Sequence, residues 1–210
     1  MYTGNEAKLG AMDDREHTAI VLRAKAELRK RLRGLRNTTP AGALAKRSER
    51  IVERLRALEA IAGAKRVALF WPIEEPPEVD LRPLDADLRA RGVEIAYPCM
   101  NQTTRETSLR LATVEELEDD PMGFRGAPLT AREPETLDAI VVPALALDAT
   151  GKRLGYGAGF YDRTLPRFAP AKKIGVAYDF QLLAEVPVLE NDVAMDIVVT
   201  DARTITLERE

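Results

Sequence analysis

Cysteine and histidine are almost absent from the 210-residue chain. Cys99 is its only cysteine, which excludes a disulfide bond within the chain and fits a reducing compartment such as the cytoplasm. His17 is its only histidine, so we expect neither a histidine base nor a histidine-rich metal site. Chemistry in this protein must therefore depend on carboxylates, lysine, arginine, tyrosine, backbone N–H groups or a bound metal ion.

Long apolar runs and a strong net charge are missing as well. No run approaches the roughly 18 apolar residues that a membrane-spanning helix needs. The formal net charge is −3, which provides no overall basic field for nucleic acid. Hydrophobic residues make up 45% of the chain, enough for a substantial core. We therefore expect a globular protein without membrane or nucleic-acid partners.

Helical and strand patterns alternate along most of the chain. Helices are expected at residues 18–36, 40–62 and 81–91 and from Phe160, and strands at 67–71, 93–97, 139–143, 174–178 and 197–200. Residues 101–137 are irregular and polar, with room for a short helix at 113–118. This order favours one three-layer αβα domain with a mostly parallel sheet over residues 18–210, the class that includes sugar-phosphate isomerases and CoA transferases. Residues 1–17 have no apolar core, so we expect a flexible tail rather than a secretory signal.

The segment from Asp138 to Leu165 carries the most informative pattern. A short apolar run, suited to a buried parallel strand, leads to three alternating glycines, Gly155, Gly157 and Gly159. Lys152 and Arg153 precede these glycines, and Asp162 follows them in the expected first turn of a helix. Converging backbone N–H groups, cations and a carboxylate suited to Mg²⁺ indicate a nucleotide triphosphate site, although the spacing matches neither standard glycine fingerprint. The plainer alternatives are a structural turn and a helix-end role for Asp162.

The expected first helix is strongly basic. It carries seven basic residues: Arg23, Lys25, Arg29, Lys30, Arg31, Arg33 and Arg36. Its apolar residues form one stripe: Val21, Leu28, Leu32 and Leu35. At about 100° per residue, Lys25, Arg29 and Arg36 lie beside this stripe, where cations can line a cleft. Arg23 and Lys30 point away from it, and the alternative for most of these residues is a solvated basic face.

Residues 142–163 resemble the hallmark of the 5-formyltetrahydrofolate cyclo-ligases (methenyltetrahydrofolate synthetases), V-P-G-L-x-F-D-x-x-G-x-R-L-G-x-G-x-G-x-Y-D-R. Three further motifs extend the likeness: KAELR at 25–29, EVD at 78–80 and QLLAEVPVLENDVAMDIVVT at 181–200. The resemblance thus covers about residues 25–200 in four separate motifs, which together are far more specific than any one of them.

The resemblance implies an ATP- and Mg²⁺-dependent ligase that converts 5-formyltetrahydrofolate to 5,10-methenyltetrahydrofolate and releases ADP and phosphate, acting as a monomer or weak dimer. It implies ATP contacts for Lys25, Arg29, Arg153, Leu154, Gly155, Tyr156, Gly157, Ala158, Gly159, Phe160 and Tyr161. It implies substrate contacts for Trp71, Glu78, Tyr156, Gly157, Ala158, Gly159 and Phe160. The metal would be held by Asp162 and Asp192, and no residue is assigned as an acid or base.

Two departures from the family pattern concern the assigned site residues. The loop before Glu78 is two residues longer than in animal-type sequences, so Glu74 or Glu75 could share the role of Glu78. Ala158 stands where glycine or lysine is common, and the phosphate contact of a lysine there would fall to Lys25, Lys152 and Arg153.

Two other functions fit parts of the pattern. A sugar-phosphate isomerase or CoA-transferase-like enzyme of the same fold class would need a dedicated base and no ATP. A catalytically silent paralogue that binds a nucleotide or RNA would suit the basic first helix, but it would have no need of the intact glycines and Asp162.

Overall fold

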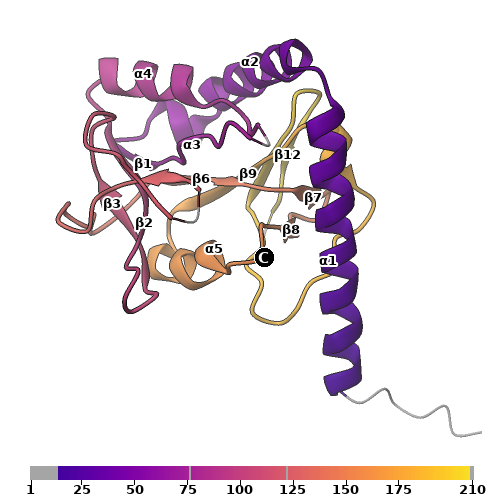
Figure 1. The fold of residues 1–210 in the computed structure, drawn as a ribbon. Helices are drawn as coiled ribbons and strands as arrows, with labels where there is room; N and C mark the ends of the chain where they lie inside the picture. The colour runs from indigo at the N-terminus through magenta and orange to yellow at the C-terminus, as the bar shows by residue number, and fades with distance from the viewer. Residues whose placement is uncertain (1–13, 76, 122, 209–210) are drawn as a thin grey trace, which may run out of the picture.

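The computed structural model describes residues 14–75, 77–121 and 123–208, which fold around one large sheet (Figure 1). The helices are α1 (Asp14–Thr38), α2 (Ala41–Ala57), α3 (Glu59–Ala62), α4 (Arg82–Ala90) and α5 (Phe160–Thr164), with 3₁₀ turns η1 (Leu165–Phe168) and η2 (Asp179–Gln181). The strands are β1 (Arg66–Ala68), β2 (Glu94–Met100), β3 (Thr107–Leu111), β4 (Glu118–Asp119), β5 (Arg125–Gly126), β6 (Ala139–Pro143), β7 (Ala146–Asp148), β8 (Arg153–Leu154), β9 (Lys172–Val176), β10 (Leu182–Leu183), β11 (Ile197–Val199) and β12 (Thr204–Thr206). None of the described helices is long and apolar enough to cross a membrane.

The large sheet has the strand order β12-β11-β9-β6-β1-β2-β3. Neighbours from β11 to β2 pair in parallel, while β12 and β3 add antiparallel edges. The central strand β6 is buried from Ala139 to Val142, as expected when helices cover both faces of a parallel sheet. The predicted α/β class with a mostly parallel sheet is therefore confirmed.

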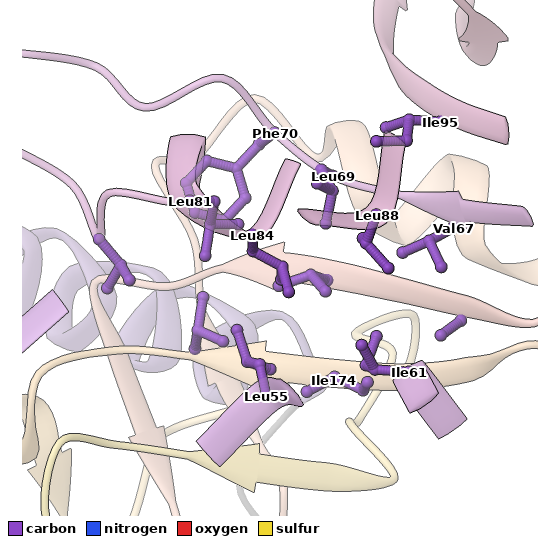
Figure 2. Packing of buried hydrophobic residues seen from close by; sticks show 14 of the residues in the cluster. Leu55, Ile61, Val67, Leu69, Phe70, Leu81, Leu84, Leu88, Ile95 and Ile174 are labelled. Atoms are coloured by element: carbon purple, nitrogen blue, oxygen red, sulfur yellow. The ribbon is translucent and has the colours of Figure 1, made fainter. Parts of the chain in front are cut away.

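Helices α2, α3 and α4 cover one face of this sheet (Figure 1). Their buried side chains, among them Leu55, Ile61, Leu84 and Leu88, pack against Val67, Ile95 and Ile174 of the strands (Figure 2). Each such burial contributes about 1.5–3 kcal/mol. This layer fixes the central strands, and hence the positions at which the chain leaves their carboxyl ends.

The other face carries a thinner cover. Helix α5 and the η1 turn pack there through Tyr161, Leu165 and Phe168. A small sheet, β10-β7-β8, lies between the large sheet and α1 (Figure 1), and Leu32 of α1 packs against its Leu154. The long first helix is thus held against the strand that leads into the glycine-rich segment.

The first helix differs from expectation at two points. It begins at Asp14 rather than residue 18, so residues 14–17 are helical and do not belong to a tail. Asp14 and Glu16 lie in the first turn, where acidic side chains suit the helix dipole. Residues 1–13 lie outside the described residues. Leu35, expected on the buried stripe, is 43% exposed, because Arg36 fills the buried position in that turn.

Other element boundaries were also wrong. The expected helix at 40–62 is broken at Leu58, whose backbone is extended, and no helix forms at 113–118. Residues 101–137, expected to be irregular, hold β3, β4 and β5. Strand β2 does not stop at Pro98 but runs to Met100. A proline is tolerated there because the β1 partner strand has already ended, so its missing N–H breaks no bond to β1.

Candidate active site

A cleft with a volume of about 520 Å³ opens at the carboxyl ends of β1, β2 and β6. Its lining includes every residue that the sequence assigned to a site: Lys25, Arg29, Trp71, Glu78, Arg153, Leu154, Gly155, Tyr156, Gly157, Ala158, Gly159, Phe160, Tyr161, Asp162 and Asp192. These residues come from α1, the loop after β1, the glycine-rich segment and the loop before β11. Four distant motifs therefore meet at the edge of the sheet where open α/β folds bind ligands.

The glycines shape the segment between β8 and α5. Gly157 and Gly159 have positive φ angles of 109° and 64°, a conformation that side chains disfavour. A Cβ atom at Gly155 would lie 2.6 Å from Nη1 of Arg153, so a larger residue there would displace this guanidinium. The segment can thus bring its backbone close to a ligand while Arg153 stays in place.

Helix α1 fixes this segment from outside the sheet. Arg29 donates from Nε to the carbonyl oxygen of Gly155 at 2.8 Å, and Arg33 donates from Nη2 to that of Tyr156 at 3.2 Å. The guanidinium of Arg33 also lies 5.4 Å from the centre of the Tyr156 ring. Burial and the charge of Arg33 lower the pKa of Arg29 below its ordinary value, although it stays a cation. Cations of one helix therefore line one side of the cleft.

Both predicted metal-binding carboxylates are held by cations that line the cleft. Asp162 accepts hydrogen bonds on Oδ1 from Nη2 of Arg153 at 2.8 Å and from the backbone N–H of Val193 at 3.2 Å. Asp192 pairs with Nζ of Lys25 and accepts from the backbone N–H of Leu189 at 2.6 Å. We refer to Lys25, Arg29, Arg153, Asp162 and Asp192 as the charged wall.

The charged wall suits Mg²⁺ bound together with phosphates. The described residues contain no cluster of three or more metal-binding side chains, so a metal held by the protein alone does not fit. Mg²⁺, however, needs only one or two carboxylates when phosphates and water complete its shell. Nε of Arg153 is buried and finds no hydrogen-bond partner within the described residues, which leaves a donor for an anion beside Asp162.

Glu78 is a buried acid that also lines the cleft. It is 6% exposed and accepts a hydrogen bond from the backbone N–H of Ile73 at 3.0 Å. Burial raises the pKa of Glu78 above its ordinary value, and the bond from Ile73, the Tyr156 hydroxyl and the charge of Arg36 oppose that rise. Burial and the nearby charge of Glu78 also raise the pKa of Tyr156, so its hydroxyl remains a proton donor.

Another part of the lining is apolar. It consists of Phe70, Trp71, Ile73, Pro98, Met100 and Phe124, which we call the apolar wall. Arg125 lies beside it, with its guanidinium 5.6 Å from the centre of the Trp71 ring. Apart from Trp71, these residues were not assigned to a site from the sequence, nor were the cleft residues Arg33, Leu22, Pro143 and Leu189. Phe70 and Met100 could have been expected at the site because they lie at or just beyond strand ends. Phe124 and Arg125, however, lie in a segment without a clear sequence pattern.

Some residues that were considered for the site from the sequence lie outside the cleft. Lys152 is outside the cleft lining and pairs with Glu185 at 3.2 Å, so it cannot stand in for a lysine at position 158. Glu74 is 84% exposed in its side chain, Glu75 is exposed as well, and neither lines the cleft. Arg23 and Lys30 are exposed on α1, as the helical geometry predicted.

The family model described as the 5-formyltetrahydrofolate cyclo-ligase family matches residues 21–201. The chain belongs to this family. The 5-formyltetrahydrofolate cyclo-ligase of Escherichia coli (strain K12) is 31% identical over 157 residues, which cover 71% of this chain and 85% of that protein. The cyclo-ligase of Mycolicibacterium smegmatis is 48% identical over 91 residues, 41% of this chain and 47% of that protein.

Solved structures agree with this assignment. The 5,10-methenyltetrahydrofolate synthetase of Aquifex aeolicus has a TM-score of 0.76 and 32% identity, covering 89% of this chain and 94% of that chain. The synthetase of Mycoplasma pneumoniae, at 24% identity and a TM-score of 0.64, shares the fold over 84% of this chain. The cyclo-ligase fold therefore extends over most of the described residues.

Proposed function

We propose that this protein converts 5-formyltetrahydrofolate to 5,10-methenyltetrahydrofolate, with ATP cleaved to ADP and phosphate. One observation carries the proposal: a single cleft joins a charged wall suited to phosphates and Mg²⁺ to an apolar wall suited to a flat ring. Membership of the cyclo-ligase family supports the same reaction.

The charged wall would bind the triphosphate. Lys25, Arg29 and Arg153 supply cations from two sides, and the backbone N–H groups between Gly155 and Gly159 supply further donors. Asp162 and Asp192 would hold Mg²⁺, which would supply positive charge to neutralise the triphosphate. With Ala158 in place of a lysine, the cations left to contact the phosphates are Lys25, Arg29, Arg33 and Arg153.

The apolar wall would bind the folate ring system. Trp71 and Phe124 offer aromatic surface, and the carboxyl group of Glu78 offers an acceptor for ring N–H groups. The segment from Tyr156 to Phe160 faces both halves of the cleft and would bring the two substrates together.

The chemistry needs positioning more than a base. The formyl oxygen would attack the γ-phosphorus of ATP, and ADP would leave. N10 would then close the ring on the activated carbon, and phosphate would leave to give the methenyl product. The cations of the charged wall would stabilise the charge that develops during phosphoryl transfer, for which a histidine is not required.

We further propose that the protein works in the cytoplasm as a monomer or weak dimer, without nucleic-acid or membrane partners. Both proposed substrates are small, water-soluble metabolites, and the net charge of −3 gives no general attraction for nucleic acid.

Omission of single components tests this proposal. The protein is incubated with 5-formyltetrahydrofolate, ATP and Mg²⁺, and the absorbance of the methenyl product is followed. We expect product only when all three are present. Product at full rate without ATP would instead favour an isomerase-type reaction, and nucleotide binding without product would favour a catalytically silent protein.

A further inference from the structure

Arg125 is a cation of the cleft lining that does not belong to the charged wall. Five basic residues line the cleft within the described part of the chain: Lys25, Arg29, Arg33, Arg125 and Arg153. The other four lie on α1 or β8, whereas Arg125 lies on β5, in the hairpin that β4 and β5 form. A cleft with cations in two separate elements suits a pair of ligands that carries anionic groups in two places, and the triphosphate accounts for only one of them.

The guanidinium of Arg125 is held beside the apolar wall. Its Nη2 donates to the backbone carbonyl oxygen of Leu117 at 2.9 Å, and its carbon atom Cζ lies 5.6 Å from the centre of the Trp71 ring. Neither contact involves a residue of the charged wall. An arginine carries five N–H donors in one plane, and a single carbonyl oxygen uses only part of this capacity. The side chain is 39% exposed, so it combines a fixed position with access for a ligand.

The carboxylate that pairs with Arg125 is a weak partner. Oδ1 of Asp119 lies 3.4 Å from Nε of Arg125, and the Asp119 side chain is 90% exposed. Such an exposed ion pair contributes little, because water and salt screen it. Arg153 of the charged wall differs, since its partner Asp162 lies at 2.8 Å and is only 24% exposed. A carboxylate of a ligand can therefore displace Asp119 from Arg125 at little cost.

We propose that Arg125 is a specificity-determining residue that binds a carboxylate of the glutamate moiety of the folate substrate. A folate joins a flat ring system, through an aminobenzoyl group, to a glutamate with two carboxylates. Rings that pack against Trp71 come to lie beside the guanidinium that contacts the same indole. A planar guanidinium also matches a carboxylate, with which it forms two parallel hydrogen bonds. The inference rests on the proposed function for the identity of the substrate and adds the group that Arg125 recognises.

A change in the ligand tests this contact without any substitution in the protein. Binding of 5-formyltetrahydrofolate is compared with binding of its diamide, in which both glutamate carboxyls are converted to neutral amides. Isothermal titration is carried out with ADP and Mg²⁺ in place of ATP, so that no turnover occurs. We expect a Kd about tenfold higher for the diamide, because it loses a charge-assisted bond to a partly exposed arginine. Equal affinity for the two compounds would overturn the inference.

Arg125→Gln then shows whether this arginine is the group that recognises the charge. The variant should bind 5-formyltetrahydrofolate about tenfold more weakly, while its affinity for the diamide should change less than about twofold. Arg125→Lys, which keeps the charge, should retain part of the preference. The control is Arg132→Gln, which removes an exposed, ion-paired arginine outside the cleft lining and should leave both affinities unchanged. The KM for ATP should stay within about twofold in all three variants.

The outcomes separate this inference from the proposed function. If Arg125→Gln weakens binding of the substrate and the diamide by the same factor, Arg125 acts only by supporting Trp71 or the hairpin, and the inference is rejected. An active cyclo-ligase that does not distinguish the two compounds would reject the inference and leave the function intact. A protein that prefers the charged compound through Arg125, yet forms no methenyl product with ATP, would uphold the inference and reject the function.

Discussion

The two walls of the cleft are built in different ways. The charged wall joins residues as far as 167 positions apart in the chain, and its two acids pair with two of its three cations, Lys25 and Arg153. The apolar wall consists of side chains that emerge where β1 and β2 end, together with Phe124, and it has no such pairing. Loss of one member of either ion pair leaves an unpaired charge, whereas loss of one member of the apolar wall leaves neighbours that still cover the ligand.

This difference predicts how mutations divide. Changes in the charged wall should damage the use of ATP severely and selectively. Changes in the apolar wall should weaken folate binding by smaller factors. Changes at Glu78 should alter both substrate binding and the way in which the stability of the fold depends on pH.

The largest effect is expected for Asp162→Asn. Loss of a metal-binding carboxylate should lower kcat/KM for ATP by more than about 100-fold. Loss of a charged hydrogen-bond partner for Arg153 should cost only about 1.5–3 kcal/mol of stability. Turnover and melting temperature are measured together. The control is Asp179→Asn, which removes an equally exposed, ion-paired acid that does not line the cleft. Equal turnover in the two variants would show that Asp162 is structural.

Lys25→Ala and Arg29→Ala should each raise the KM for ATP. A charge-assisted hydrogen bond to phosphate is worth about 1.5–3 kcal/mol, which corresponds to about one to two decades in kcat/KM. Arg23→Ala is the matched control, because Arg23 is exposed on the same helix. All three variants could instead lose similar activity, and added salt could remove the difference between them and the wild type. That result would mean that the helix acts only as a general positive charge.

Trp71→Leu should raise the KM for 5-formyltetrahydrofolate by about tenfold, with little change for ATP. The leucine keeps apolar area but loses the aromatic face, whose stacking is worth about 0.5–1.5 kcal/mol beyond burial. Steady-state kinetics with each substrate varied in turn make the comparison. Phe180→Leu, which removes an aromatic ring stacked on Tyr178 outside the cleft, should change neither KM. A larger effect on ATP than on folate would mean that the two walls have been assigned to the wrong substrates.

The smallest effect is a pH-dependent gain in stability for Glu78→Gln. Burial raises the folded-state pKa of Glu78 above its ordinary value of 4.5, so the ionised acid destabilises the fold. This penalty is absent below the ordinary pKa and grows as the pH rises through the raised one. Relative to the wild type, the melting temperature of the variant should therefore rise by roughly a few degrees between acidic and neutral pH. Thermal unfolding of both proteins across this range makes the comparison, and a difference that stays constant with pH would contradict a raised pKa for Glu78.

The sheet and the cations of α1 could be predicted because their signals are local, whereas Asp192 was assigned only through the family resemblance. Buried strands such as β6 form short apolar runs, and helical geometry separated Lys25 and Arg29 from Arg23. The glycine-rich run carried its own conformational requirement, which the positive φ angles of Gly157 and Gly159 bear out. That the four motifs meet in one cleft was implied by the family resemblance, not by any one motif.

The apolar wall and the buried bond between Arg36 and Tyr156 could not be predicted because they depend on tertiary packing. Phe124 and Arg125 belong to a short hairpin of two-residue strands, too brief for an alternating pattern to appear. From the sequence, Pro98 indicated the end of a strand. A proline fits within β2 because β1 ends earlier, so that no hydrogen bond to β1 is lost. The burial of Arg36 and its bond to Tyr156 join positions 120 apart, which no local pattern records.

The central claim, that the charged wall binds phosphates and metal, is tested most directly by the dependence of methenyl formation on ATP and Mg²⁺ in the wild-type protein and in Asp162→Asn. We expect one ADP released for each methenyl product, no product without either component, and a loss of more than about 100-fold in the variant. Product formed without ATP, or a fully active Asp162→Asn protein, would contradict the assignment of the charged wall to phosphates and metal.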